Sequence, residues 1–204
     1  AGFKVLRGQP FCSLCDVLGT APESLDALAL VFHCGSVGTR AVIWDGFLER
    51  MGQLGCSGPT QLRQCLTAVT NAVCDHSWAE FLSWAFDTFI TSPAAGRRAA
   101  LDRSATAQLL RTLCCPRYHL ATELASFIEE HADDLIRKDL WLMLMHFLRE
   151  FPDVAALKII NLEASPWPSI IDEFVEHQRF CQSAEASWIA DAATQPLSGM
   201  SSSE

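Results

Sequence analysis

Apolar residues recur at three- and four-residue spacing along most of the chain, the period of an α-helix with one buried face. Proline and serine at the start of such stretches, and glycine at their ends, indicate where helices begin and stop. Three predicted helices are defined by where they start, at Pro22, at Ser57-Pro59 and at Ser77. Two more are defined by their ranges, about 41–54 and 102–114. The last three are defined by their apolar groups, within 120–128, 141–148 and 170–175.

The segments between these helices are polar or rich in proline and glycine, and few stretches alternate as strands do. Residues 153–166 are expected to form a longer connection, and Trp188-Ile189 to begin a short helix or a docking tail. About nine helices and very little strand predict an all-α fold with a single domain. We expect a lead-in over 1–8, the domain over 9–194 and a disordered Ser-rich tail over 195–204.

Composition narrows the function classes. The 204 residues are 50% hydrophobic and carry a formal net charge of −9. This charge disfavours a nucleic-acid partner, which requires a basic surface, and it favours a basic protein partner or simply solubility. The longest apolar run, residues 140–148, is about half of what a membrane span needs. Neither a membrane span nor an export signal is predicted, so we expect a protein of the cytoplasm or nucleus.

Nine cysteines, an odd number, lie within the helical patterns. Without an export signal they are expected to be reduced thiols, most of them small core residues. Cys12-x-x-Cys15 and Cys114-Cys115 resemble the cysteine pairs of metal sites, but a structural zinc site needs four ligands in suitable pairs. Cys74-Asp75-His76 suggests a thiol nucleophile, yet adjacent residues seldom face each other productively. No metal, cofactor or catalytic residue is therefore predicted.

Two segments between predicted helices have the length of calcium loops, 33–44 and 91–104. Calcium requires several carboxylates at alternating positions. The first segment contains none and the second contains only Asp102, so both loops are expected to be empty.

Three motifs in order resemble the potentiating-neddylation domain of the defective-in-cullin-neddylation family. They are FLERMGQLGC at 47–56, FLSWAFDTFITSP at 81–93, and KDLW at 138–141 together with PWPSIIDEFVEH at 166–177. The resemblance covers about residues 8–180. It implies an EF-hand-like helical domain without calcium, and a non-catalytic co-ligase that promotes cullin neddylation. The implied partners are the C-terminal winged-helix region of a cullin, the N-acetylated N-terminus of the neddylation conjugating enzyme, and the RING subunit of the cullin complex.

The resemblance also assigns residues to the cullin contact. The acidic–alanine–acidic pattern of the family falls on Asp139, Pro166 and Asp172, with Glu173 beside them. Pro166 departs from the pattern, because the family has alanine there. Two carboxylates that flank a small apolar spot can steer and orient a basic partner. The alternative is that both aspartates only favour the dipoles of their own helices.

A second implied site is an apolar pocket for the acetylated methionine. The aligned positions are Phe11, Cys15, Ala27, Leu30, Thr39, Val42, Phe89 and Leu113. The family has larger residues at Ala27 and Val42 and an amide at Thr39, so this pocket is expected to differ in shape. Ordinary core packing is the alternative for each apolar position.

Two other functions stay open at this point. A helical adaptor of the same fold would bind an unrelated basic partner. A cysteine-dependent transferase would carry the modifier as a thioester and would show a reducible adduct.

Overall fold

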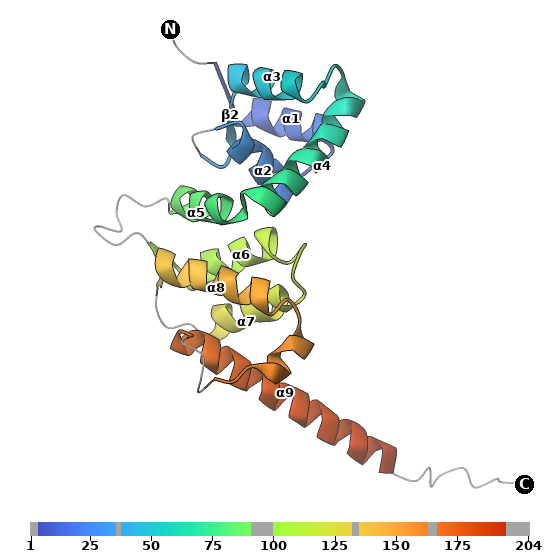
Figure 1. Cartoon of the computed structure of the whole chain (residues 1–204), viewed down its shortest axis with the longest axis vertical. Helices are drawn as coiled ribbons and strands as arrows, with labels where there is room; N and C mark the ends of the chain where they lie inside the picture. The colour runs from blue at the N-terminus through green and yellow to red at the C-terminus, as the bar shows by residue number, and fades with distance from the viewer. Residues whose placement is uncertain (1–3, 36–37, 91–99, 132–134, 163–166, 195–204) are drawn as a thin grey trace, which may run out of the picture.

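The computed structural model describes residues 4–35, 38–90, 100–131, 135–162 and 167–194, with Pro59 and 185–194 described for the backbone alone. These residues form nine α-helices, one 3-10 helix and four short strands. The prediction of an all-α domain is confirmed. Figure 1 shows two stacked groups of helices, with α1–α5 at the N-terminal end and α6–α9 at the C-terminal end.

The N-terminal group contains α1 (Gln9–Leu18), α2 (Leu25–His33), α3 (Trp44–Gln53), α4 (Pro59–His76) and α5 (Trp78–Phe89). The sequence interpretation did not include α1, although it carries the signals of a helix. Pro10 stands in its first turn, and Phe11, Cys15 and Leu18 are buried at helical spacing. Gly19 ends it with φ 74°, a left-handed conformation that glycine adopts without strain.

Strand pairing changes two predicted boundaries in this group. β1 (Val5–Arg7) and β2 (Ala41–Ile43) form an antiparallel pair in which Leu6 lies opposite Val42. Residues 5–7, expected to be a lead-in, therefore contribute a strand. The helix predicted from about residue 41 begins only at Trp44, because the β-branched Val42 and Ile43 pair with β1 instead.

The C-terminal group contains α6 (Arg103–Leu113), α7 (Leu120–His131), α8 (Lys138–Glu150), the 3-10 helix η1 (Val154–Ile159) and α9 (Ser169–Thr194). β3 (Ala100–Leu101) precedes α6 and pairs antiparallel with β4 (Ile136–Arg137), which precedes α8. This pairing joins the segment before α6 to the segment before α8. Within the described part of the segment 91–104, the Asp102 carboxylate accepts a hydrogen bond from the Ala105 N–H at 2.8 Å and thereby caps α6.

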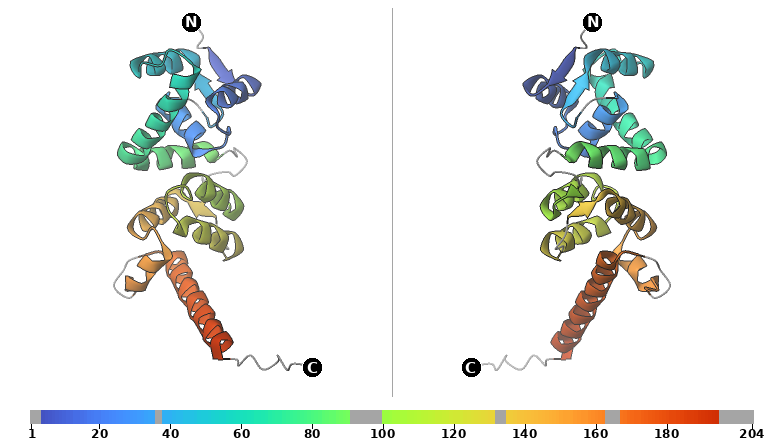
Figure 2. Two further views of the ribbon diagram at one scale, coloured as in Figure 1. Left: turned by 90° about the vertical axis from the view of Figure 1, so that its right-hand side faces the viewer. Right: turned by 90° about the vertical axis from the view of Figure 1, so that its left-hand side faces the viewer.

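α9 is longer than predicted. One continuous helix of 26 residues replaces the expected helix and separate short helix near Trp188. Both views of Figure 2 show its second half extending away from the other helices. The predicted tail, 195–204, lies outside the described residues.

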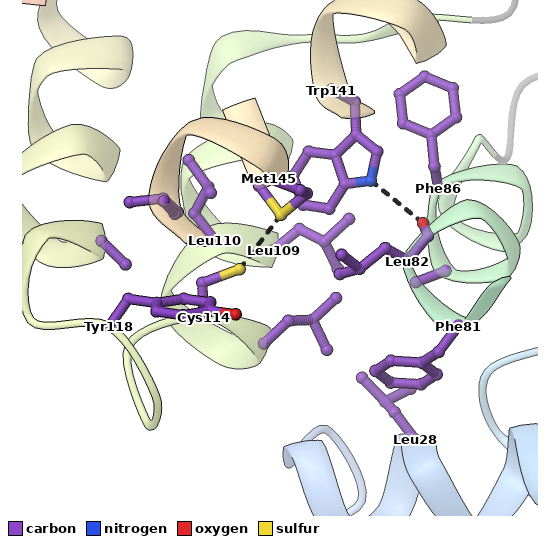
Figure 3. Close-up of a cluster of buried hydrophobic side chains, with 14 of the residues drawn as sticks. Leu28, Phe81, Leu82, Phe86, Leu109, Leu110, Cys114, Tyr118, Trp141 and Met145 are labelled. Atoms are coloured by element: carbon purple, nitrogen blue, oxygen red, sulfur yellow. Dashed lines mark hydrogen bonds between the residues drawn. The ribbon is translucent and has the colours of Figure 1, made fainter. Parts of the chain in front are cut away.

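α5 and α8 join the two groups through a buried tryptophan (Figure 3). The Trp141 side chain is fully buried, and its indole N–H donates a hydrogen bond to the Leu82 carbonyl at 3.1 Å. Its ring lies 6.3 Å from that of Phe86. At the surface, the Lys138 ammonium pairs with the Asp87 carboxylate at 2.5 Å. A single hydrophobic cluster therefore runs through both groups of helices.

Candidate functional site

The acidic residues assigned to the cullin contact lie at the starts of α8 and α9. Asp139 occupies the first turn of α8 and is exposed. Asp172 occupies the first turn of α9 and is half-buried, and Glu173 beside it is exposed. Within the described residues no lysine, arginine or histidine forms an ion pair with any of the three. Asp139 and Asp172 thus lie in first helical turns, where the helix dipole favours a negative charge, and neither is neutralised by a described cation.

Asp172 is the most constrained of these residues. One of its carboxylate oxygens, Oδ1, is buried and has no hydrogen-bond partner in the described structure. Its backbone N–H donates to the Pro168 carbonyl at 3.3 Å, in the first turn of the helix. A buried carboxylate oxygen without a donor costs free energy.

Trp167 fixes the start of α9 against α8. Its ring lies 5.6 Å from that of His146, 5.5 Å from Phe147 and 6.3 Å from Phe151. His146 is seven residues after Asp139, so both project from the same face of α8, about 10 Å apart along its axis. The aromatic contact therefore places the Asp172 helix beside the exposed face of α8 that carries Asp139. Pro166, the third assigned residue, lies outside the described residues.

The residues assigned to the acetyl-methionine pocket belong to the core. Six of them have side chains at most 1% exposed: Phe11, Cys15, Ala27, Leu30, Val42 and Leu113. They come from α1, α2, β2 and α6, while Thr39 and Phe89 are partly exposed. An incoming methionine would have to displace side chains that now pack against each other. The geometry therefore favours core packing for these six in the free protein.

An open groove that the sequence interpretation did not include lies between α3 and the start of α4. Its volume is about 270 Å³, and Trp44, Phe47, Leu48, Met51 and Leu62 provide its apolar lining. Trp44 and Phe47 stack there with ring centroids 5.4 Å apart. The apolar residues of 44–54 recur at three- and four-residue spacing and form one stripe, so periodicity alone did not show that part of it lines an open groove.

The expectation of reduced thiols is wrong for one pair. Cys56, at the turn between α3 and α4, and Cys65 on α4 form a disulfide. The alternation of apolar residues along α4 gave no sign of it, because the pairing depends on how the α3–α4 turn folds back over the helix. The other seven cysteines are free; Cys15, Cys34, Cys74 and Cys114 are buried, and Cys12, Cys115 and Cys181 partly exposed.

Burial makes the inner thiols poor nucleophiles. It raises the pKa of Cys15 and of Cys34 to about 11, and it also raises the pKa of Cys74 and of Cys114. His76 and Asp75, which follow Cys74 in the sequence, are exposed, and Asp75 lies 3.6 Å from the Arg117 guanidinium. Cys74 is therefore a neutral core thiol.

We expect iodoacetamide at pH 8 to alkylate Cys12, Cys115 and Cys181 well before Cys15 and Cys34 in the folded protein. A thiol whose pKa is about 11 is only about 0.1% thiolate at pH 8, and its burial excludes the reagent as well. Peptide mass spectrometry over a time course measures this, with urea-unfolded protein as the control in which all free thiols react. Equal labelling rates in the folded protein would contradict the burial described here.

None of the helices, within the residues that the structure describes, is long and apolar enough to cross a membrane. Across the same residues, no three histidine, cysteine, aspartate or glutamate side chains converge as a metal site would require.

Comparison with known proteins places this geometry in context. A profile of the family described as Cullin binding matches residues 61–177. The chain is 23% identical to DCN1-like protein 4 of Drosophila melanogaster over 171 residues, 83% of this chain and 66% of that protein. It is 25% identical to DCN1-like protein 4 of Danio rerio over 169 residues, 79% of this chain and 56% of that protein.

A shorter stretch is more similar to a fungal relative. Over 51 residues, 25% of this chain and 19% of the relative, the chain is 43% identical to Defective in cullin neddylation protein 1 of Candida glabrata. The chain thus spans less than two thirds of the length of these relatives. The family profile covers α8 and the start of α9, where the acidic residues lie.

Proposed function

Since the chain belongs to the cullin-binding family of defective-in-cullin-neddylation proteins, we propose that it is a non-catalytic scaffold co-ligase for cullin neddylation. The chain would bind the C-terminal winged-helix region of a cullin and the N-acetylated N-terminus of the neddylation conjugating enzyme. By holding both, it would bring the modifier within reach of the target lysine. Proximity and orientation of this kind can contribute several kcal/mol to lowering a barrier.

The observation that carries the proposal is the pair of unpaired carboxylates at the α8 and α9 starts. Asp139 and Asp172 lie on adjoining helices, and neither forms an ion pair with a described residue. Such a surface is complementary to lysine and arginine side chains, and it orients a partner as well as attracting it. The net charge of −9 acts in the same direction at longer range.

The thiol chemistry leaves a transferase only three accessible free thiols among the described residues, those of Cys12, Cys115 and Cys181. Carrying the modifier as a thioester would need an accessible thiolate. Cys15, Cys34, Cys74 and Cys114 are buried with raised pKa values, and Cys56 and Cys65 are bonded to each other. The proposed role asks only for binding surfaces.

The second contact is proposed at the edge of the N-terminal core. Thr39 and Phe89 are partly exposed beside the buried pocket positions, so the methionine would enter there and displace core side chains. Acetylation would matter because burying an ammonium without a partner costs far more than burying an amide.

Reconstituted modifier transfer to a cullin C-terminal domain tests both contacts. We expect the chain to accelerate transfer, and to do so about tenfold more with the N-acetylated conjugating enzyme than with the unacetylated one. The measurement is the initial rate at increasing concentrations of the chain. The co-ligase proposal would be contradicted if the chain accelerated transfer with neither form of the enzyme. Equal acceleration with both forms would leave the co-ligase proposal standing and would contradict the proposed contact with the acetylated methionine.

A further inference from the structure

Two large apolar side chains stand almost fully in solvent at the C-terminal end of the molecule. Ile159, at the end of η1, is 82% exposed, and Phe180, on α9, is 72% exposed. They are the most exposed large hydrophobic residues in the described part of the chain. Large apolar side chains that gather on one surface mark binding sites more often than singly scattered ones do.

Arg179 joins η1, which carries Ile159, to α9, which carries Phe180. Its guanidinium donates hydrogen bonds to the Leu157 carbonyl at 2.9 Å and to the Ile160 carbonyl at 2.6 Å. These carbonyls lie on either side of Ile159, and Arg179 immediately precedes Phe180. The hydrogen bonds therefore fasten η1 to α9, so the two elements that carry Ile159 and Phe180 are held together.

This surface continues the acidic face. Asp172, Glu176 and Phe180 are four residues apart, so they form one stripe along α9 over about 12 Å. Glu176 is exposed. The opposite side of the helix is occupied by Ile171, Phe174 and Val175, which are fully buried in the core. The stripe thus runs from carboxylates at the helix start to an apolar end.

The remaining flank of α9 is covered by α7. The His177 ring lies 5.3 Å from the rings of both Phe127 and His131. The free side of α9 is therefore the one that carries Glu176 and Phe180. The family profile ends at residue 177, before Phe180.

We propose that Ile159 and Phe180 form the apolar half of the cullin contact whose acidic half begins at Asp139 and Asp172. The inference rests on the proposed function. Its occupant is the same cullin domain, which would present basic side chains to the carboxylates and an apolar recess to Phe180. Continuity of the stripe along one rigid helix supports a single partner, and an apolar centre beside charged residues is the usual composition of a protein interface.

Binding of a cullin C-terminal domain to serine variants tests the inference. We expect Phe180→Ser and Ile159→Ser each to weaken binding about tenfold, mainly through faster dissociation, as measured by surface plasmon resonance. The loss should be the same at low and high salt, because the lost contact is apolar. The control is Val17→Ser, a 45% exposed apolar residue on α1 at the other end of the molecule, which should leave binding unchanged.

The outcomes separate the two proposals. If the unchanged chain binds the cullin domain and both serine variants bind within twofold of it, the inference is overturned and the proposed function stands. If the unchanged chain binds no cullin domain, both fall. Sedimentation of the same variants tests whether a second copy of the chain binds there. If the unchanged chain dimerises, Phe180→Ser is monomeric and its affinity for the cullin domain is unaltered, the patch is a self-association surface and the inference is overturned. Circular dichroism melting verifies that the variants remain folded, as expected for such exposed positions.

Discussion

Replacing Asp139 and Asp172 together by lysine is expected to weaken binding of a cullin C-terminal domain at least about 100-fold. Each substitution converts an attraction into a repulsion at the point where a basic partner docks. Two such changes of about 1.4 kcal/mol each correspond to a factor of 100. Isothermal titration calorimetry at two salt concentrations measures the loss, which should shrink as salt screens the repulsion.

The matched control is the double variant Asp45→Lys and Glu80→Lys. These two acids occupy the first turns of α3 and α5, just as Asp139 and Asp172 occupy those of α8 and α9. The net charge and the loss of helix-dipole stabilisation are therefore the same in both double variants, about 0.3–1 kcal/mol for each acid. An equal loss of affinity in the control would mean that overall charge, and not this face, drives binding.

Trp141→Ala is expected to lower the free energy of unfolding by about 3–5 kcal/mol. The substitution empties the largest fully buried position and removes the hydrogen bond from the indole N–H to the Leu82 carbonyl. Since Trp141 links α8 to α5, the two groups of helices should lose their main buried contact (Figure 3). Urea unfolding followed by circular dichroism measures the change.

Trp141→Phe provides the comparison for this position. It keeps an aromatic ring beside Phe86 and Met145 but cannot donate to Leu82, so we expect a smaller loss of about 1–2 kcal/mol. A loss from Trp141→Ala no greater than that from Trp141→Phe would show that the ring itself contributes little to joining the helices. Such a result would contradict the packing described here.

The candidate site was predictable in part. Resemblance identified Asp139, Asp172 and Glu173, and Pro168 marked the start of the helix in whose first turn Asp172 lies, where an acid is favoured. What the pattern could not provide was the contact between Trp167 and α8 that sets the two helices beside each other. The same limit applies to the pocket positions. Resemblance assigned Phe11 and Leu30 to a pocket, but neither resemblance nor periodicity distinguishes a filled core from a cavity.

Sequence alone determined the fold class and most helix boundaries of this protein. Apolar spacing, the Pro59 start, the Gly55 turn and the Asp102 cap act over a few residues, so their effect is readable locally. The tertiary structure decided the rest: the pairing of 5–7 with 41–43, the Cys56–Cys65 disulfide, the hydrogen bond from Trp141 to the Leu82 carbonyl, and the exposed stripe from Asp172 to Phe180. These features join residues far apart in the chain, or depend on which side of a helix finds a neighbour, and that is settled only when the helices pack together.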